Sequence, residues 1–533
     1  MSPMKQHKNQ FIIGAFVLTL AGLFSRFAGF FYRIFLSHQL GPEGMGLYQL
    51  IFPVYGICMS LCCTSIQTAL SRFIASESHK SGTKSSRAYF GCALFLSLSL
   101  ALTSSVALYF FSDLIALHLL SEVRCVHLLQ MMSLAVPICA AHSCIVGYYY
   151  GLQKTTVPAI SQIVEQTIRM TAVFLIYQIM QSRRLEFQVI HAVYGLVIGE
   201  IGSLFYCLCA FGPLWAKSGK LHLSASFHTN IEASAGKPHK YHTNPSPYIH
   251  TPQAYMGSLL RLVIPMTANR LCLSLLQSGE AILIPAKLRL SGLTQSDALS
   301  LFGTLTGMAL PFILFPSTLI NSLAVMLLPE VAKAQASGNN KRVQHTSDLS
   351  IRLSLVIGIL CLGIFRYFGE ALGVVVFNNE TAGSFITQMS FLCPFLYLSV
   401  TLGSIINGLG KTDVTFYHTL CSLAIRLSVV FFVMPKIGIT AYFYGLLGSE
   451  IVLTALHLRY LCRTTGLRMN LTEAVLKPTF TLLPVCLSGS ALQTLLNTKT
   501  HLSELTVYLL TGAWFVCSYL GIIALWSEKD TDD

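Results

Sequence analysis

Long apolar runs recur from one end of this chain to the other, each of roughly the 20 residues that a helix needs to cross a bilayer. Only 11% of the residues are charged, whereas a soluble globular chain carries about 25%. A water-facing surface for a soluble protein of this size cannot be built from so few charges. A β-barrel would show alternating strands of about 10 residues, and this sequence has no such pattern. The sequence therefore predicts an all-α integral membrane protein.

We count about fourteen candidate transmembrane helices in the sequence. They centre on 11–37, 47–75, 88–112, 126–149, 157–180, 188–214, 258–285, 298–328, 349–372, 384–408, 413–434, 438–462, 473–496 and 503–526. The apolar run that follows the N-terminal MSPMKQHKNQ has no small-residue cleavage site, so we expect it to be retained as the first span.

The net charge of +13 is concentrated in the loops on one side of these spans. The loops after spans two, six, eight and twelve contain Lys80, Lys84, Arg87, Lys217, Lys220, Lys237, Lys240, Lys333, Lys341, Arg342, Arg459, Arg463 and Arg468. By the positive-inside rule these loops and both termini are cytoplasmic, although Arg183–Arg184 and Lys287 with Arg289 would then lie outside. We expect a multi-pass protein of the bacterial cytoplasmic membrane, with the forespore membrane as an alternative location.

The sequence contains two related halves separated by a polar stretch. GLQKTTV at 151–157 recurs as GLGKTDV at 408–414, and YGLVIGEI at 194–201 recurs as YGLLGSEI at 444–451. The predicted organisation is a six-helix lobe at 1–215, a weakly structured cytoplasmic linker at 216–257, a second six-helix lobe at 258–465, and two additional helices with a cytoplasmic tail at 466–533. Repeats of the same orientation imply a pseudo-two-fold axis along the membrane normal, and transporters usually bind substrate where such halves meet.

Two arginines stand inside the first apolar run, at Arg26 and Arg33. An arginine at the centre of a membrane helix costs roughly 2.5–3.5 kcal/mol, so we do not expect Arg26 to face lipid. Seven residues is close to two helical turns, and both side chains should project from one face. Arg33 is nearer the outer end of its span, so snorkelling to the interface is an alternative for it.

Other ionisable residues fall into a repeated set and an unrepeated set. The repeat brings Arg169 opposite Arg426 and Glu200 opposite Glu450, and Glu165 stands four residues before Arg169, a spacing at which the two can pair. We interpret these five residues as structural charges.

The unrepeated charges are candidates for substrate contact. They are Arg26, Arg72 and Arg270, with Arg33 and Glu280 as further candidates. An offset of 254 residues places Glu280 opposite Arg26 in the repeat, so we expect a carboxylate of one half to face an arginine of the other. Snorkelling is an alternative for Arg72, which is near the cytoplasmic end of its span.

Deep, spaced arginines predict an anionic ligand. Guanidinium groups bind phosphate through two parallel hydrogen bonds and stay charged in a low dielectric, which suits a diphosphate. Gln67, Asn321 and Asn407 could bind sugar hydroxyls, or they could form interhelical hydrogen bonds. The cysteine and histidine spacings suggest no metal site, and we expect no cofactor and no nucleic-acid partner.

Four segments carry a resemblance to a known family. They are SRFAGFFYRIFLSHQLGPEGMGLYQLIFP (25–53), PMTANRLCLSLLQSGEAILIP (265–285), INSLAVMLLPEVAKA (320–334) and NGLGKTDV (407–414). These resemble the stage V sporulation protein B group, which belongs to the oligosaccharide flippases of the multidrug/oligosaccharidyl-lipid/polysaccharide exporter superfamily and is related to the MurJ-type lipid II flippases.

The resemblance implies a fourteen-helix, MATE-like fold in which two lobes enclose a central cavity and transport proceeds by alternating access. The implied substrate is an undecaprenyl-diphosphate-linked sugar, such as peptidoglycan precursor of the lipid II type for the spore cortex. The family's S-R-x-x-G pattern, important for substrate handling, matches Ser25, Arg26 and Gly29, while Arg33 stands one residue later than the usual partner position.

Three alternatives remain open at this point. A cation-coupled multidrug exporter of the same superfamily would depend on a membrane-embedded acid, for which Glu280 is the candidate. A membrane glycosyltransferase would need catalytic residues in sizeable outer loops, and the outer loops here are short, so we do not expect an enzyme. A non-transporting scaffold that recruits cell-wall synthesis enzymes is the third alternative.

Overall fold

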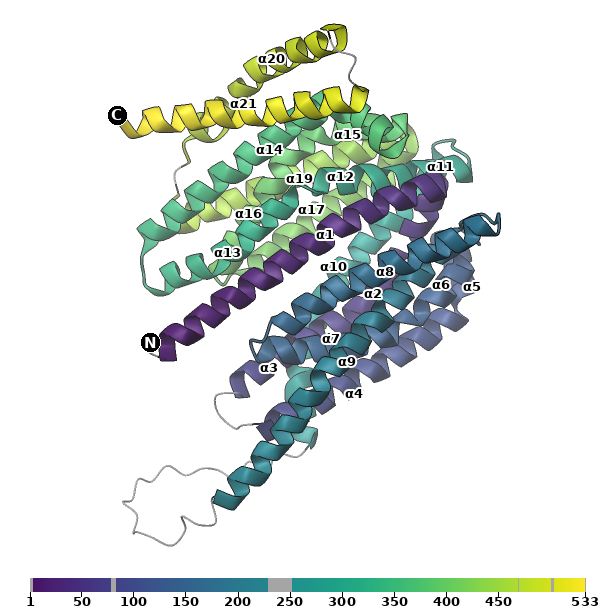
Figure 1. The fold of residues 1–533 in the computed structure, drawn as a ribbon, viewed down its shortest axis with the longest axis vertical. Coiled ribbons are helices and arrows are strands. Elements are labelled where there is room, and N and C mark those ends of the chain that lie inside the picture. The colour runs from purple at the N-terminus through teal and green to yellow at the C-terminus, as the bar shows by residue number, and fades with distance from the viewer. Residues whose placement is uncertain (1–2, 78–82, 229–251, 468, 500–502, 533) are drawn as a thin grey trace. The chain divides into compact units, whose positions relative to one another are not determined.

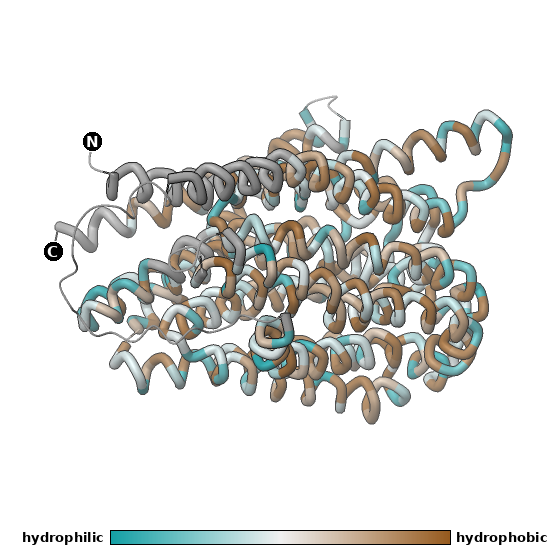
Figure 2. The backbone as a smooth tube through the Cα atoms, turned by 90° about the horizontal axis from the view of Figure 1, so that it is seen from below, coloured by the Kyte–Doolittle hydropathy of each residue, from teal (hydrophilic) through white to brown (hydrophobic). Residues whose placement is uncertain are grey.

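The structure is a computed structural model that describes residues 3–77, 83–228, 252–467, 469–499 and 503–532. Within these ranges every regular element is a helix, so the predicted all-α architecture is confirmed (Figure 1). Apolar residues follow the described helices for most of their length (Figure 2). The chain divides into two compact units, Met1–Gly29 with Ile51–Ser278, and Phe30–Leu50 with Gly279–Asp533.

Unit 1 contains most of the first half of the chain. Its elements are the first part of α1 (Pro3–Leu50), α2 (Phe52–Met59), the π-helical turn η1 (Ser60–Thr64), α3 (Ser65–Glu77), α4 (Thr83–Phe110), α5 (Ser112–Leu114), η2 (Ile115–Leu120), α6 (Cys125–Ser133), α7 (Ala135–Gly151), α8 (Thr156–Ser182), α9 (Val189–His228) and the first part of α10 (Pro252–Leu290).

Unit 2 contains the remainder. Its elements are the last part of α1, the last part of α10, α11 (Gln295–Gly303), η4 (Thr304–Ala309), α12 (Leu310–Leu314), α13 (Ser317–Ala336), α14 (Asn340–Phe377), α15 (Glu380–Met389), η5 (Ser390–Leu392), α16 (Cys393–Gly408), α17 (Thr412–Phe432), α18 (Met434–Ile437), α19 (Ile439–Thr465), η6 (Thr472–Leu476), α20 (Lys477–Lys499) and α21 (Glu504–Asp532).

Twelve helical segments of the described chain are long and apolar enough to cross a membrane. The first of them, Val17–Ser76, is 60 residues long and covers two of the fourteen predicted spans. The predicted span at 157–180 is α8, which carries Glu165 and Arg169 and is less apolar than the twelve. These two differences account for the gap between fourteen and twelve.

The polar stretch at 216–257 is partly helical, which corrects the expectation of a weakly structured linker. Helix α9 continues to His228, and α10 begins at Pro252. The rest of the predicted linker, 229–251, lies outside the described residues. The two helices extend beyond their apolar spans, so the polar composition of this stretch did not indicate a loop.

The boundaries of the two compact units differ from those of the lobes expected at 1–215 and 258–465. Unit 1 continues into α10 because Tyr255, Leu259 and Val263 are buried in a core with residues of α3, α4 and α7. Helix α1 breaks at Gly41, whose φ of 66° lies in the left-handed region that favours glycine. Its last part belongs to unit 2.

Glycines allow the last part of α1 to pack closely against α11. A Cβ on Gly303 would lie 2.0 Å from the carbonyl oxygen of Pro42, and a Cβ on Gly46 would lie 2.2 Å from that of Leu299. Such distances leave no room for a side chain, so the two backbones are in direct contact. Elsewhere in unit 2, α14 packs against α15 and α16, and the C-terminal pair α20 and α21 packs against α14 (Figure 1).

Candidate functional site: charged residues in the membrane spans

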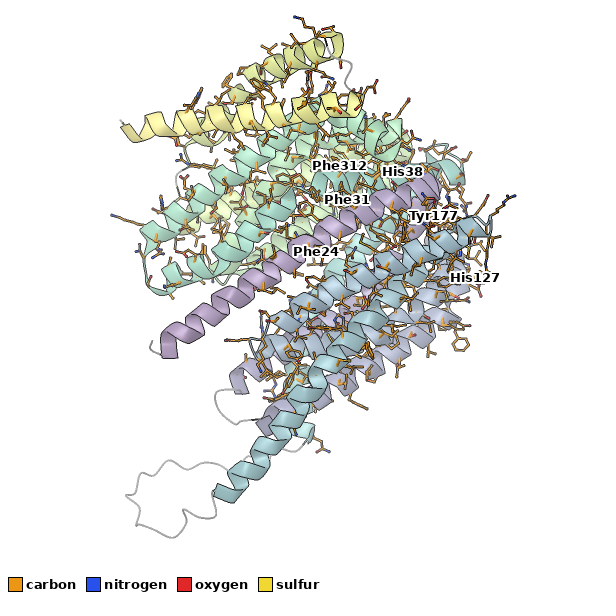
Figure 3. The ribbon with its side chains drawn as sticks, viewed as in Figure 1. Phe24, Phe31, His38, His127, Tyr177 and Phe312 are labelled. Carbon is orange, nitrogen blue, oxygen red and sulfur yellow. The ribbon has the colours of Figure 1, made fainter. Side chains whose placement is uncertain are left out.

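Arg26 is an exposed side chain of unit 1, on α1. Each residue turns about 100° around a helix, so the exposed Phe24 and Phe27 lie about 160° and 100° around α1 from Arg26. Figure 3 labels Phe24 on this helix. Gly29 is on the arginine side, about 60° away, where a Cβ would lie 3.5 Å from Nε2 of Gln166 on α8. Arg26 therefore shares its side of the helix with Gly29, whereas Phe24 lies on nearly the opposite side.

Arg33 is also exposed, in the part of α1 that belongs to unit 2. Its neighbour Phe31 is 60% exposed, and Phe30 packs against Phe312 and Phe315, with ring centroids 5.4 and 4.6 Å apart (Figure 3). The helix continues past Arg33 as far as the break at Gly41.

Helix α3 places Gln67 and Arg72 in different environments. Gln67 is half-buried at the crossing of α3 and α7, where a Cβ on Gly147 would lie 3.1 Å from its Cγ. Arg72 is exposed toward the C-terminal end of the helix. Gln67 therefore contributes to helix packing, and Arg72 is accessible.

Helix α10 carries Arg270 within a polar stripe. Thr267, Arg270, Ser274 and Gln277 recur at intervals of three and four residues, which places them on one face of the helix. Between Ile264 and Gln277 no residue of α10 is fully buried. Just beyond, the hydroxyl of Ser278 donates a hydrogen bond to the carbonyl oxygen of Pro53 at 2.9 Å. The exposed members of the stripe are Arg270 and Gln277, whereas the hydroxyl of Thr267 is buried without a hydrogen-bond partner among the described residues.

Arg26, Arg72 and Arg270 have a further property in common. None of the three makes an ion pair or a side-chain hydrogen bond with any other described residue. All three are exposed and belong to unit 1. Their charges are therefore uncompensated by the described part of the chain.

The repeated charges of unit 1 form a partly buried cluster. Arg169 pairs with Glu165 on the same helix, α8, as the spacing of four residues predicted. Glu200 of α9 is only 6% exposed, and its Oε2 lies 3.8 Å from Nδ1 of the buried His142 on α7. Because α8 packs against α9, these charges join three helices of the unit.

The repeated charges of unit 2 form a corresponding cluster with a different acid. Nε of Arg426 on α17 lies 2.7 Å from Oε1 of Glu280 on α10, so the two side chains form an ion pair, and the Tyr442 hydroxyl donates to the same carboxylate oxygen at 2.9 Å. The hydroxyl of Ser399 donates to Glu450 at 3.1 Å. The Glu280 side chain is only 7% exposed. The sequence predicts that Glu280 contacts substrate and faces Arg26. Within unit 2 its carboxylate contacts Arg426 and Tyr442, so it lies among the structural charges of that unit.

The repeat explains why the arginine of unit 2 pairs with an acid from another helix. The offset of 257 residues that equates Arg169 with Arg426 equates Glu165 with Ser422. Arg426 therefore has no acid four residues before it, and Glu280 from another helix compensates it. The missing acid at position 422 was the signal in the sequence that could have identified the pair. His142, Ser203 and Tyr442 are polar partners that the sequence analysis did not single out.

The two asparagines make local hydrogen bonds. The Asn321 amide donates to the carbonyl oxygen of Ser317 at 3.0 Å, one turn earlier on α13. The side-chain oxygen of Asn407 accepts from the hydroxyl of Thr415 at 2.8 Å, which connects α16 to α17. Both side chains are half-buried. No group of three or more metal-ligating side chains occurs among the described residues.

Comparison with known proteins identifies the family of this chain. Residues 11–319 match the family model described as polysaccharide biosynthesis protein. The chain is 23% identical over 481 residues to stage V sporulation protein B of Bacillus subtilis (strain 168), which covers 90% of this chain and 88% of that protein.

Solved structures show the same fold. The lipid II flippase MurJ in an inward closed conformation superposes with a TM-score of 0.72 at 12% identity, over 96% of this chain and 99% of that one. An inward-facing multidrug resistance MATE family transporter of the MOP superfamily superposes with a TM-score of 0.59 at 13% identity, over 84% and 94% of the two chains. The predicted family resemblance and MATE-like fold are therefore confirmed.

Proposed function

Since this chain belongs to the polysaccharide biosynthesis protein family, we propose that it is a flippase that moves an undecaprenyl-diphosphate-linked sugar across the cytoplasmic membrane. One observation carries the proposal: Arg26, Arg72 and Arg270 are exposed and uncompensated, whereas Arg169 and Arg426 are paired with acids. A cation without a partner in a membrane span needs an anionic ligand, a water-filled cavity or a position near a span end, as for Arg72, from which it can snorkel to the interface.

The substrate class follows from the chemistry of these groups. A diphosphate offers oxygens at two positions to guanidinium groups at different heights, each able to make two parallel hydrogen bonds. The hydroxyl and amide side chains of the α10 stripe suit sugar hydroxyls. The relatives named stage V sporulation protein B and lipid II flippase MurJ support a peptidoglycan precursor of the lipid II type, used for the spore cortex.

Transport proceeds by alternating access, with the isoprenoid tail in lipid while the head group passes through the protein. No bond of the substrate is broken, so the chain needs no catalytic residue. The basic loops support a topology with both termini in the cytoplasm. The cation-coupled exporter has less support because Glu280, its candidate acid, is engaged by Arg426 and Tyr442.

The decisive experiment is reconstitution in liposomes with a labelled undecaprenyl-diphosphate sugar, followed by measurement of the label that reaches the opposite leaflet. We expect Arg26→Ala and Arg270→Ala each to slow transport about tenfold to a hundredfold, because a hydrogen bond to a charged group contributes about 1.5–3 kcal/mol. Arg261→Ala is the matched control, since Arg261 is exposed on the same helix about 180° from Arg270.

Two results would contradict the proposal. The first is no transfer above protein-free liposomes. The second is an equal loss in Arg261→Ala and Arg270→Ala, which would mean that any charge removed from α10 impairs the protein.

A further inference from the structure

His142 and Glu200 form a buried acid–base pair that the flippase proposal does not use. His142 of α7 and Glu200 of α9 are 9% and 6% exposed. Their facing atoms, Nδ1 and Oε2, are 3.8 Å apart, within ion-pair range and beyond hydrogen-bond range. Oε2 of Glu200 has no hydrogen-bond partner among the described residues.

The charges of this cluster balance only when one proton is added. Glu165 and Glu200 contribute two negative charges, and Arg169, which pairs with Glu165, contributes one positive charge. A buried uncompensated carboxylate is costly, and it is relieved by a proton on the acid or by a cation beside it. His142 is the nearby group that can supply that cation. The pair therefore has two neutral arrangements, a carboxylic acid with imidazole or a carboxylate with imidazolium.

The hydrogen bonds around His142 accommodate both arrangements. Ser203 Oγ lies 2.9 Å from Nε2 of His142 and 3.4 Å from the carbonyl oxygen of Ser161. When the imidazole is neutral with its proton on Nδ1, the Ser203 hydroxyl donates to Nε2. When the imidazole is charged, Nε2–H donates to Ser203, whose own proton turns to the Ser161 carbonyl.

Other titratable groups also face Glu200. Glu165 and Arg169 come from α8, Cys139 from α7, and Tyr55 from α2. Cys63 of η1 lies beside Cys139. Thiols and phenols are uncharged at neutral pH, so they add dipoles to the cluster and no charge. The proton needed for balance therefore belongs to the pair of Glu200 and His142.

We propose that His142 and Glu200 together bind one exchangeable proton within unit 1, and that its binding and release drive the transport cycle. The second clause rests on the proposed flippase function, and the first does not. The pair titrates as one site, so the proton is assigned to both residues together.

Unit 2 provides the internal comparison. The offset of 257 residues places Ser399 at the position of His142 and, with the second repeat, Glu450 at the position of Glu200. Ser399 donates to Glu450 at 3.1 Å, and a hydroxyl cannot take up a proton at physiological pH. Glu450→Gln therefore removes the corresponding acid and leaves the proposed site intact.

The proton site is tested on the purified full-length protein without substrate. Nitrogen-15 resonances of labelled histidine follow the imidazole, with His142→Gln identifying its signal, and the infrared band of a protonated carboxyl follows Glu200, with Glu200→Gln identifying its contribution. We expect at least one signal to titrate between about pH 5 and pH 8. Removing either residue should shift the titration of the other by more than about one pH unit, and Glu450→Gln should change neither.

Two results would overturn the site. In the first, neither signal titrates in that range. In the second, each signal titrates identically whether or not the other residue is present. Coupling is tested in liposomes with an imposed pH gradient, which should stimulate transport at least tenfold in the wild type and less than twofold in Glu200→Gln. Equal stimulation in both would overturn coupling. A protein that shows the linked titration but moves no substrate would keep the proton site and refute the flippase proposal.

Discussion

Replacing Glu280 with glutamine should destabilise unit 2 more than the same replacement of a solvent-exposed glutamate. The Glu280 carboxylate forms an ion pair with Arg426, whose Nε lies 2.7 Å from it, and accepts a hydrogen bond from the hydroxyl of Tyr442 at 2.9 Å. The two charged side chains are only 7% and 16% exposed, so glutamine would leave the guanidinium buried without a counter-charge. Removing one partner of a buried pair costs about 3–5 kcal/mol. We expect a loss of that size in the free energy of unfolding.

The assay is denaturant-driven unfolding of the detergent-solubilised protein, applied as a double-mutant cycle. Glu280→Gln with Arg426→Gln should be more stable than Glu280→Gln alone, because no uncompensated charge remains. Glu165→Gln is the matched control in unit 1. It should cost less, because its pair is formed within one helix and the acid is 22% exposed. Full stability of Glu280→Gln, or additivity of the two substitutions, would refute the reasoning.

Three further changes test other parts of the structure. Gly303→Ala should destabilise the protein by about 1–3 kcal/mol, because its Cβ would lie 2.0 Å from the Pro42 carbonyl oxygen. Gly448→Ala is the control, because no atom lies within 4 Å of a Cβ at that position. Equal melting temperatures of the two variants would contradict the close packing. Arg352→Ala should accelerate hydrogen exchange in Lys477–Lys499, because Arg352 pairs with Asp348 and with Glu473 of η6, the turn that precedes this helix. Arg342→Ala, which loses only its pair with Glu330, should not accelerate it. Arg26→Lys should transport at a rate between those of the wild type and Arg26→Ala, because lysine keeps the charge and loses the planar fork; a rate equal to that of the wild type would argue against paired hydrogen bonds to phosphate.

The membrane fold was predictable because its signal is local and repeated. A run of apolar residues identifies a span without knowledge of its neighbours, and the described helices follow the predicted spans closely. Helices that contain polar residues have a weaker signal in the sequence. Helix α8 carries an ion pair within its span, and α9 continues to His228 through a polar sequence. Composition alone does not separate such helices from loops.

The partners of the charges were only partly predictable. Glu165 and Arg169 share a helix, so their spacing of four residues was sufficient. Glu280 and Arg426 come from distant parts of the chain, and the repeat suggested Arg26 as the partner instead. The pair of His142 and Glu200 was missed for a related reason: the second half has Ser399 in place of the histidine, so a search for repeated charges passed over it.

The two halves keep the same electrostatic requirement while they change the residues that meet it. Each buried cluster contains one arginine and two acids, Arg169 with Glu165 and Glu200 in unit 1, and Arg426 with Glu280 and Glu450 in unit 2. The second acid of unit 1 faces an imidazole, whereas that of unit 2 accepts from a hydroxyl. Only an imidazole changes its charge in the physiological pH range. The asymmetry therefore assigns proton exchange to unit 1, and it leaves the unit 2 cluster as a fixed connection among α10, α17 and α19.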